Sequence, residues 1–273
     1  MNNRGFTLVE LAVALVIGGF LVGVVFQFVN GHQRFVGMQS AREEVQQNGR
    51  AALELISAEL RGASRGGIVA ATAGSIRFRS PRIWGIVCGP EVSGTRVVVF
   101  PGVDLTPFKG SNLPDSLALR ESPAAPPVQW RFASVTDATP AAGQGAAQCG
   151  VIDPQPGRVQ VRTLTNVPTT IPFQLGEPAY LYDIVEYATG NSNVPGKWLL
   201  RTAGGPAQPL AGPLKEVESV PVFRLRYFDA GGTVLDPIVV ANIAEVEVKV
   251  TTISRSSKPS LEFSDSTRVR LRN

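Results

Sequence analysis

A single carboxylate stands inside an otherwise apolar stretch near the start of the chain. Glu10 is the only acidic residue between Phe6 and Val29, and Arg4 is the only Lys or Arg among the first 33 residues. A carboxylate in the apolar layer of a membrane costs on the order of 2–3 kcal/mol near the centre and less towards an end, so it needs a cationic partner. Glu10 is therefore the first candidate for a functional residue, and its chemistry is ion pairing.

The sequence offers little for catalysis. The one histidine, His32, cannot by itself supply a catalytic triad or a histidine-based metal site. We find no Gly-x-Ser-x-Gly elbow and no Walker phosphate loop, and the acidic residues lack the spacing of a calcium loop. We therefore expect a protein that is not an enzyme and that holds neither a cofactor nor a metal ion.

One group of cations stands close to an aromatic side chain. Arg77, Arg79 and Arg82 are followed by Trp84. Cations next to an aromatic ring are typical of proteins that bind single-stranded nucleic acid, although the solvent face of a strand beside a loop aromatic has the same composition. These four residues are the one patch that we nominate for a nucleic-acid partner.

The chain has two cysteines, Cys88 and Cys149, too few for a disulfide scaffold and too far apart for a CxxC motif. In an exported protein they could form one disulfide, which would contribute roughly 3–4 kcal/mol of stability on the loop-entropy model. Two unpaired thiols are the alternative.

Composition places the chain among folded proteins. Of its 273 residues, 44% are hydrophobic and 18% are charged, which argues against general disorder. The net charge of +4 is mild, and the basic residues are scattered. An anionic partner is therefore permitted by the charge but not required by it.

The apolar stretch that holds Glu10 is long enough to cross a membrane. Residues 6–29 are almost wholly apolar, and about 20 such residues span a bilayer core. A cleaved secretory signal would have a shorter apolar region followed by a small-residue cleavage site, and no A-x-A follows this stretch. A plain signal anchor would not need Glu10. The sequence therefore predicts one transmembrane helix with a functional acid.

The string Arg4-Gly5-Phe6-Thr7-Leu8-Val9-Glu10 resembles the signature of the type IV prepilin family. The resemblance implies that residues 1–5 are a leader peptide and that a prepilin peptidase cleaves between Gly5 and Phe6. It also implies that the new amino terminus at Phe6 is methylated, and that Glu10 pairs with the terminal amine of a neighbouring subunit. A buried amine and a buried carboxylate are each costly alone, so pairing them between subunits would fix the axial register.

A second, amphipathic helical pattern follows the apolar stretch. Between residues 35 and 61 the apolar residues recur at steps of three, four and seven, at Phe35, Met38, Val45, Ala52, Leu53, Ile56 and Leu60. Gly62 and the Gly66-Gly67 pair are helix stop signals. Residues 30–62 therefore continue the transmembrane helix. Residues 44–61 resemble the corresponding stretch of PilW-like minor pilins, although Ala51 replaces their usual Phe. Residues 182–227 and 269–273 resemble the carboxy half of PilW-like and J-type pilins.

Residues 63–273 read as a β-rich head without a clear internal domain boundary. Period-two alternation predicts strands at residues 75–79, 128–132 and 158–162, and β-branched or aromatic runs predict others at 95–100, 222–228, 243–253 and 267–271. Residues 180–187 and 197–201 read as a hairpin. The fold class is therefore α+β, with a long helix packed on an antiparallel sheet.

The prepilin resemblance sets the expected function. It implies a minor pilin of a type IV pilus, a filament used for adhesion, twitching motility or DNA uptake, with a minor pseudopilin of a type II secretion system as the alternative. A monomeric membrane-anchored binding domain is the alternative from another class. The implied partners are other pilins or pseudopilins, the prepilin peptidase, the inner-membrane assembly platform and the lipid bilayer. The implied location is the inner membrane, with the head in the periplasm, and then the filament.

Overall fold

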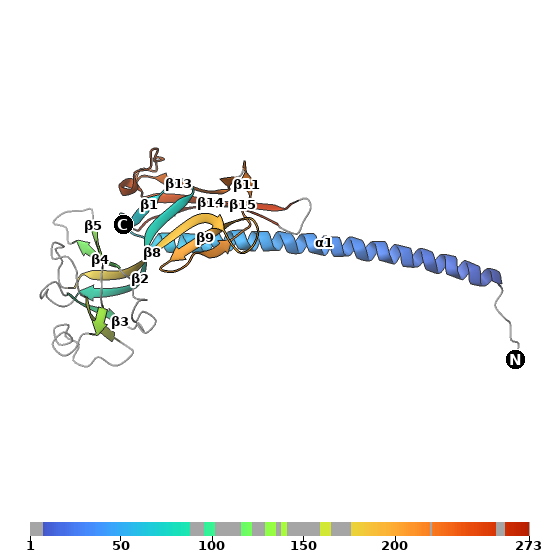
Figure 1. The fold of residues 1–273 in the computed structure, drawn as a ribbon, viewed down its shortest axis with the longest axis horizontal. Coiled ribbons are helices and arrows are strands. Elements are labelled where there is room, and N and C mark those ends of the chain that lie inside the picture. The colour runs from blue at the N-terminus through green and yellow to red at the C-terminus, as the bar shows by residue number, and fades with distance from the viewer. Residues whose placement is uncertain are drawn as a thin grey trace.

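A single helix dominates the molecule. The computed structural model describes residues 8–87, 96–101, 116–121, 129–134, 138–140, 159–164, 176–218, 220–254 and 260–272. Helix α1 runs without a break over Leu8–Gly62, which is about 82 Å at 1.5 Å per residue. One end of α1 lies in the head and the other projects far beyond it (Figure 1). The predicted helix end at Gly62 is confirmed.

The larger sheet follows the helix in the chain. Its strands are antiparallel and pair in the order β10-β9-β8-β2-β3-β7-β6, with β1 added on β2 and the β4–β5 pair added on β8. The bounds are β1 Ile68–Ala71, β2 Ser75–Val87, β3 Arg96–Pro101, β4 Ser116–Glu121, β5 Gln129–Ser134, β6 Ala138–Pro140, β7 Val159–Leu164, β8 Pro178–Asn191, β9 Lys197–Ala203 and β10 Gln208–Ala211.

A second, three-stranded antiparallel sheet closes the head. It has the order β13-β14-β15, with β13 at Phe223–Phe228, β14 at Glu245–Ile253 and β15 at Glu262–Arg270. A two-stranded hairpin, β11 (Glu216–Val217) and β12 (Val220–Pro221), precedes it, and the short 3-10 helix η3 (Val240–Asn242) separates β13 from β14.

Most strands lie where the sequence pattern predicted them, and the differences have local causes. The predicted hairpin is formed by β8 and β9, with Tyr187 opposite Arg201. The strand predicted from residue 243 begins at Glu245, because residues 240–242 form η3. Strand β15 begins at Glu262, five residues before the predicted start, and its alternation is hidden because the inward-facing Asp265 and Thr267 are polar like the outward-facing serines.

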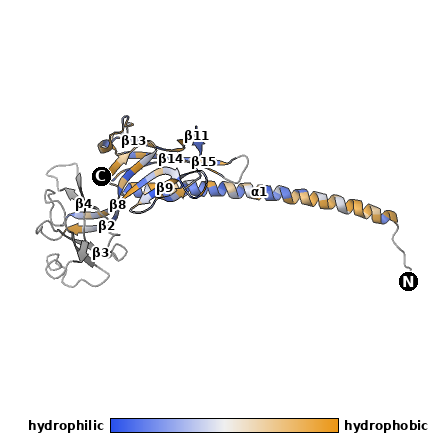
Figure 2. Ribbon diagram, viewed as in Figure 1, coloured by the Kyte–Doolittle hydropathy of each residue, from blue (hydrophilic) through white to orange (hydrophobic). Residues whose placement is uncertain are grey.

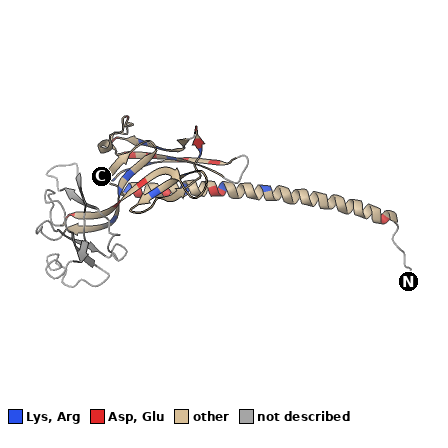
Figure 3. Ribbon diagram, viewed as in Figure 1, with Lys and Arg blue, Asp and Glu red and all other residues tan. Residues whose placement is uncertain are grey.

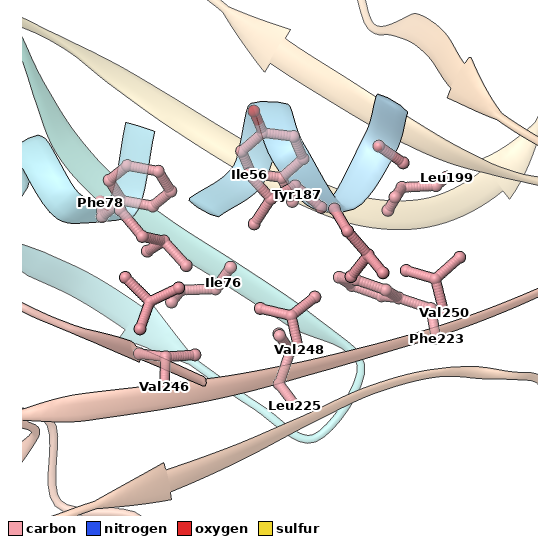
Figure 4. Packing of buried hydrophobic residues seen from close by; sticks show 14 of the residues in the cluster. Ile56, Ile76, Phe78, Tyr187, Leu199, Phe223, Leu225, Val246, Val248 and Val250 are labelled. Carbon is pink, nitrogen blue, oxygen red and sulfur yellow. The ribbon is translucent and has the colours of Figure 1, made fainter. Parts of the chain in front are cut away.

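The hydrophobic core lies where α1 passes between the two sheets. Ile56 from the helix meets Tyr187 and Phe78 of the large sheet on one side and Val248 of β14 on the other (Figure 4). The rings of Phe78 and Tyr187 stack with centroids 6.1 Å apart. Burial of these apolar side chains from both sheets fixes the carboxyl-terminal part of the helix in the head.

The buried stripe of the helix is shorter than the sequence predicted. Phe35 and Met38, which the pattern assigned to the stripe, have exposed fractions of 54% and 48%, because the described strands do not cover that part of the helix. Burial begins with Ala41 and continues at Val45, Gly49, Ala52, Leu53, Ile56, Ser57 and Leu60.

Gly49 lies where strand β15 packs closely against the helix. A Cβ atom added at Gly49 would lie 2.6 Å from Phe263 Cδ1 of β15, a distance that real Cβ atoms do not tolerate. One helical turn earlier, the Thr252 hydroxyl donates a 3.0 Å hydrogen bond to the Val45 carbonyl. A side chain at this position would have to displace the Phe263 ring, so glycine suits the close approach of the two elements.

Candidate functional site

The amino-terminal half of α1 has a bare apolar surface. Every large hydrophobic side chain from Leu8, which is 84% exposed, to Val29, which is 42% exposed, lies open to solvent. The ribbon in Figure 2 is coloured mostly hydrophobic along the part of the helix that projects farthest from the head. Among the described residues, α1 is the one helix long and apolar enough to cross a membrane. A soluble monomer does not leave such a surface uncovered, so a bilayer or other helices must cover it.

The same helix supplies the apolar surface and a wall of the head's core. Ile56 and Leu60 near its end are fully buried, and no break separates them from the bare half. A secretory signal that is removed after export would not be continuous with a core helix. The structure therefore favours an anchor that stays attached to the head.

Glu10 lies in the first turn of the described helix. It is the isolated acidic residue at the far end of α1 in Figure 3. The amino-terminal end of a helix carries a partial positive charge, which favours a carboxylate there. Gly5 and Phe6 lie outside the described residues, and the predicted cleavage junction and methylation site therefore stay predictions.

A charged cluster that the sequence pattern did not predict fastens the helix to the large sheet. Glu59 is a charged residue outside the predicted apolar stripe of the helix, but its side chain is only 12% exposed and turns towards β8 and β9. Tyr187 donates a 2.6 Å hydrogen bond to Glu59 Oε2. Arg201 donates from Nη2 to Oε1 at 2.5 Å and from Nε to Oε2 at 3.3 Å, a two-pronged contact with the same carboxylate. A signal was present in the alternation of β8 and β9, which places Tyr187 and Arg201 directly opposite each other.

Electrostatics in this cluster follow from its burial. Burial, then the hydrogen bond and charge of Glu59, raise the pKa of the Tyr187 phenol well above its usual value, against a smaller opposing effect of Arg201. Burial acts to lower the pKa of Arg201, but the hydrogen bond and charge of Glu59 raise it by more, with a smaller contribution from Tyr187. The cluster therefore keeps a neutral phenol and a charged guanidinium around one carboxylate, an arrangement that fixes structure.

A second buried phenol connects the two sheets. Tyr227 of β13 donates to the carbonyl oxygens of Thr72 at 2.8 Å and Ser75 at 3.2 Å, in the turn between β1 and β2. Burial raises the pKa of the Tyr227 phenol above its usual value.

The two raised phenol pKa values predict a loss of stability in alkali. Above about pH 10 the unfolded chain releases these protons while the folded chain retains them. The stabilising contribution is therefore complete below pH 10 and declines as the pH rises further. We expect the urea midpoint of the wild type to decrease as the pH is raised from 9.5 to 11.5. The urea midpoint of Tyr227→Phe should decrease less steeply over the same range. Equal slopes for the two proteins would contradict the assignment.

The cations nominated for binding nucleic acid already make contacts within the protein. Arg82 donates to Asp183 at 2.8 Å, and Arg77 stands directly opposite Glu186. Arg79 donates to the Gly66 carbonyl at 3.2 Å and lies 5.9 Å from the ring centre of Tyr182. Trp84, in contrast, is 49% exposed. The four residues share strand β2, but acidic neighbours offset two of the cations, and their role in binding stays a prediction.

The remaining sequence predictions concern the two cysteines and metal binding. Cys88 and Cys149 lie outside the described residues, and their disulfide stays a prediction. Within the described ranges, no three His, Cys, Asp or Glu side chains gather in a group that could hold a metal ion.

Comparison with known proteins bears on the amino-terminal part of the chain. Residues 1–26 match the family model of the prokaryotic N-terminal methylation motif. No curated protein and no solved structure matches the chain. The match, together with the long apolar helix and the antiparallel head, supports a type IV prepilin-like protein of the pilin or pseudopilin class.

Proposed function

We propose that this chain is a minor structural subunit of a type IV pilus that primes or caps filament assembly. The observation that carries the proposal is the bare apolar half of α1, which holds Glu10 in its first turn and lies largely within the matched residues 1–26. Such a helix is suited to packing among copies of itself or its relatives in a filament core. The head of more than 200 residues is large for a subunit repeated along a whole pilus, which favours a minor position near the tip.

In this proposal the amino-terminal residues carry the assembly chemistry. The prepilin peptidase cleaves after Gly5 and methylates the amine of Phe6. In the filament, the carboxylate of Glu10 pairs with the methylated terminal amine of a neighbouring subunit. Each charge alone would be costly in the apolar layer, and the pair offsets much of that cost. The pair therefore selects one axial position for each subunit.

The proposed location follows from the same features. The helix holds the chain in the inner membrane with the head in the periplasm until the assembly platform moves it into the filament. The partners are then other pilins, the peptidase, the platform and the bilayer. No catalytic role is proposed for the chain, which is a substrate of the peptidase.

The proposal predicts a defined processed form. The intact mass of the protein purified from its native membrane should correspond to a chain that begins at Phe6 and carries one added methyl group. A strain without prepilin peptidase should yield the chain with residues 1–5 still attached and without the methyl group. An unprocessed, unmethylated chain in both strains would overturn the proposal in favour of a monomeric anchored binding domain.

A further inference from the structure

The three-stranded sheet has one face that looks away from the helix. The inward residues Val246, Val248 and Val250 of β14 pack towards α1 (Figure 4). Side chains alternate along a strand, so the residues between them face outward. The cross-strand register places the outward residues in three rows, Phe228–Glu245–Arg270, Arg226–Glu247–Arg268 and Arg224–Lys249–Ser266.

These rows carry an excess of positive charge. Five outward residues are cations, and we call them the basic face: Arg224, Arg226, Lys249, Arg268 and Arg270. All five are exposed. The two acidic residues in the same rows are already engaged, Glu247 with Arg226 at 3.4 Å and Glu245 with Arg268 at 2.6 Å. The three rows therefore have a net charge of about +3 by formal count.

One cross-strand pair on this face works against the stability of the sheet. Arg224 of β13 stands directly opposite Lys249 of β14. Like charges in directly opposed positions destabilise an antiparallel pair. The outward neighbour on the next strand is Ser266, which brings no negative charge. An anion bound between Arg224 and Lys249 would remove this repulsion.

The chemistry of the basic face favours phosphate as that anion. Four of its five cations are arginines, whose planar guanidinium groups bind phosphate with two parallel hydrogen bonds. Residues two apart on a strand are about 6.8 Å apart, so the pairs 224/226 and 268/270 present cations at a regular spacing to a regularly charged polymer. The sheet faces sideways from α1 in Figure 1, away from the end of the helix where a membrane would lie. Lipid headgroups are therefore poorly placed to meet it.

The aromatic content of the basic face indicates which form of nucleic acid suits it, duplex or single-stranded. Phe228 is the one aromatic residue in the three outward rows, and it is only 5% exposed. The guanidinium of Arg268 covers it, 3.6 Å from the ring centre. Binding to single strands relies on bases that stack on exposed aromatic rings. A face with cations but no free ring suits the outside of a duplex.

We propose that the basic face binds the phosphodiester backbone of double-stranded nucleic acid without regard to sequence. Arg224 and Lys249 contact phosphates directly, and Arg226, Arg268 and Arg270 extend the contact along the sheet. This inference concerns the surface of the head. It does not depend on the proposed processing or filament assembly, because the purified monomer has the same face.

The test uses the full chain in a non-ionic detergent and a fluorescein-labelled 20-base-pair duplex of arbitrary sequence, with binding followed by fluorescence anisotropy. We expect binding that weakens with salt, with a log–log slope of about −3, because Glu245 and Glu247 offset two of the five cations and leave roughly three uncompensated charges. Arg224→Gln/Lys249→Gln should weaken binding about tenfold at 100 mM salt and bring the slope to about −1. Its melting temperature should equal or exceed that of the wild type, because the repulsion is gone.

The matched control is Arg77→Gln/Arg82→Gln, which removes the same charge from strand β2. We expect it to bind as the wild type does, and a second duplex of different sequence to bind equally well. Loss of binding in this control with none in Arg224→Gln/Lys249→Gln would move the site to β2 and overturn the inference. Binding only to phosphatidylserine vesicles or to polyglutamate, and not to the duplex, would also overturn it. Failure here would leave the processed mass unchanged, so it can be distinguished from failure of the proposed function.

Discussion

Replacing Glu10 by valine should remove the chain from the filament while leaving its head folded. In the proposed assembly the substitution leaves a neighbouring subunit's terminal amine without its partner in the apolar layer. An unpaired buried charge costs about 3–5 kcal/mol, which corresponds to a loss of more than a hundredfold in the equilibrium for incorporation. The measurement is the amount of the chain in sheared filaments relative to the amount in membranes, by quantitative immunoblotting.

A matched control lies on the same helix. Gln27→Val also replaces a polar residue by valine in the exposed apolar half, but it removes no charge. We expect normal incorporation of this variant, and membrane levels of both variants equal to those of the wild type. Normal incorporation of Glu10→Val would overturn the assembly role of Glu10. The identity of the filament that contains the wild-type chain, pilus or secretion pseudopilus, also comes from this experiment.

Removing the Glu59 carboxylate should produce the largest loss of stability among single polar substitutions in the described head. Glu59→Ala leaves the guanidinium of Arg201, whose side chain is 18% exposed, and the buried hydroxyl of Tyr187 without their shared acceptor. Loss of one partner from a largely buried ion pair costs about 3 kcal/mol. We expect a corresponding shift of the urea midpoint in mild detergent, followed by tryptophan fluorescence.

A control variant and a double-mutant cycle make this result interpretable. Glu54→Ala removes an acidic residue from the exposed side of the same helix, and its effect should stay within about 0.5 kcal/mol. Glu59→Met/Arg201→Met removes both charges, and it should cost less than the summed costs of Glu59→Met and Arg201→Met, each measured alone. Additive costs would show that the carboxylate and the guanidinium do not act together, and the fastening role of the cluster would then be wrong.

The sequence predicted those elements in which the spacing of apolar residues follows directly from their burial. Val45, Ala52 and Ile56 recur at helical spacing because one side of α1 meets both sheets, and Gly62 ends the helix because the chain must turn there. The hairpin of β8 and β9 was predicted because its strands alternate around a polar turn. The candidate assembly residues at the amino terminus were predicted from an acid in an apolar stretch and from family resemblance, not from packing.

Features that depend on contacts between distant segments were not predicted. Phe35 and Met38 have the same spacing as buried residues, but no described strand reaches them. Glu59 has the composition of a solvated residue, and only the pairing of β8 with β9 brings Arg201 to it. The basic face likewise arises from the register of three strands, two of which are separated by a 3-10 helix. Local pattern carries no information on these pairings.

Helix α1 also sets the angular position of the head. Residues from Gly31 to Ser40 are exposed on all sides and form a bare stalk between the apolar half and the first buried position at Ala41. Each residue of a helix adds about 1.5 Å and about 100° of rotation. Deleting one stalk residue would therefore turn the head by about 100°, whereas inserting seven would raise it by about 10 Å but leave its direction within about 20°. In the proposed filament, the number of residues in the stalk would therefore determine which side of the head faces the next subunit.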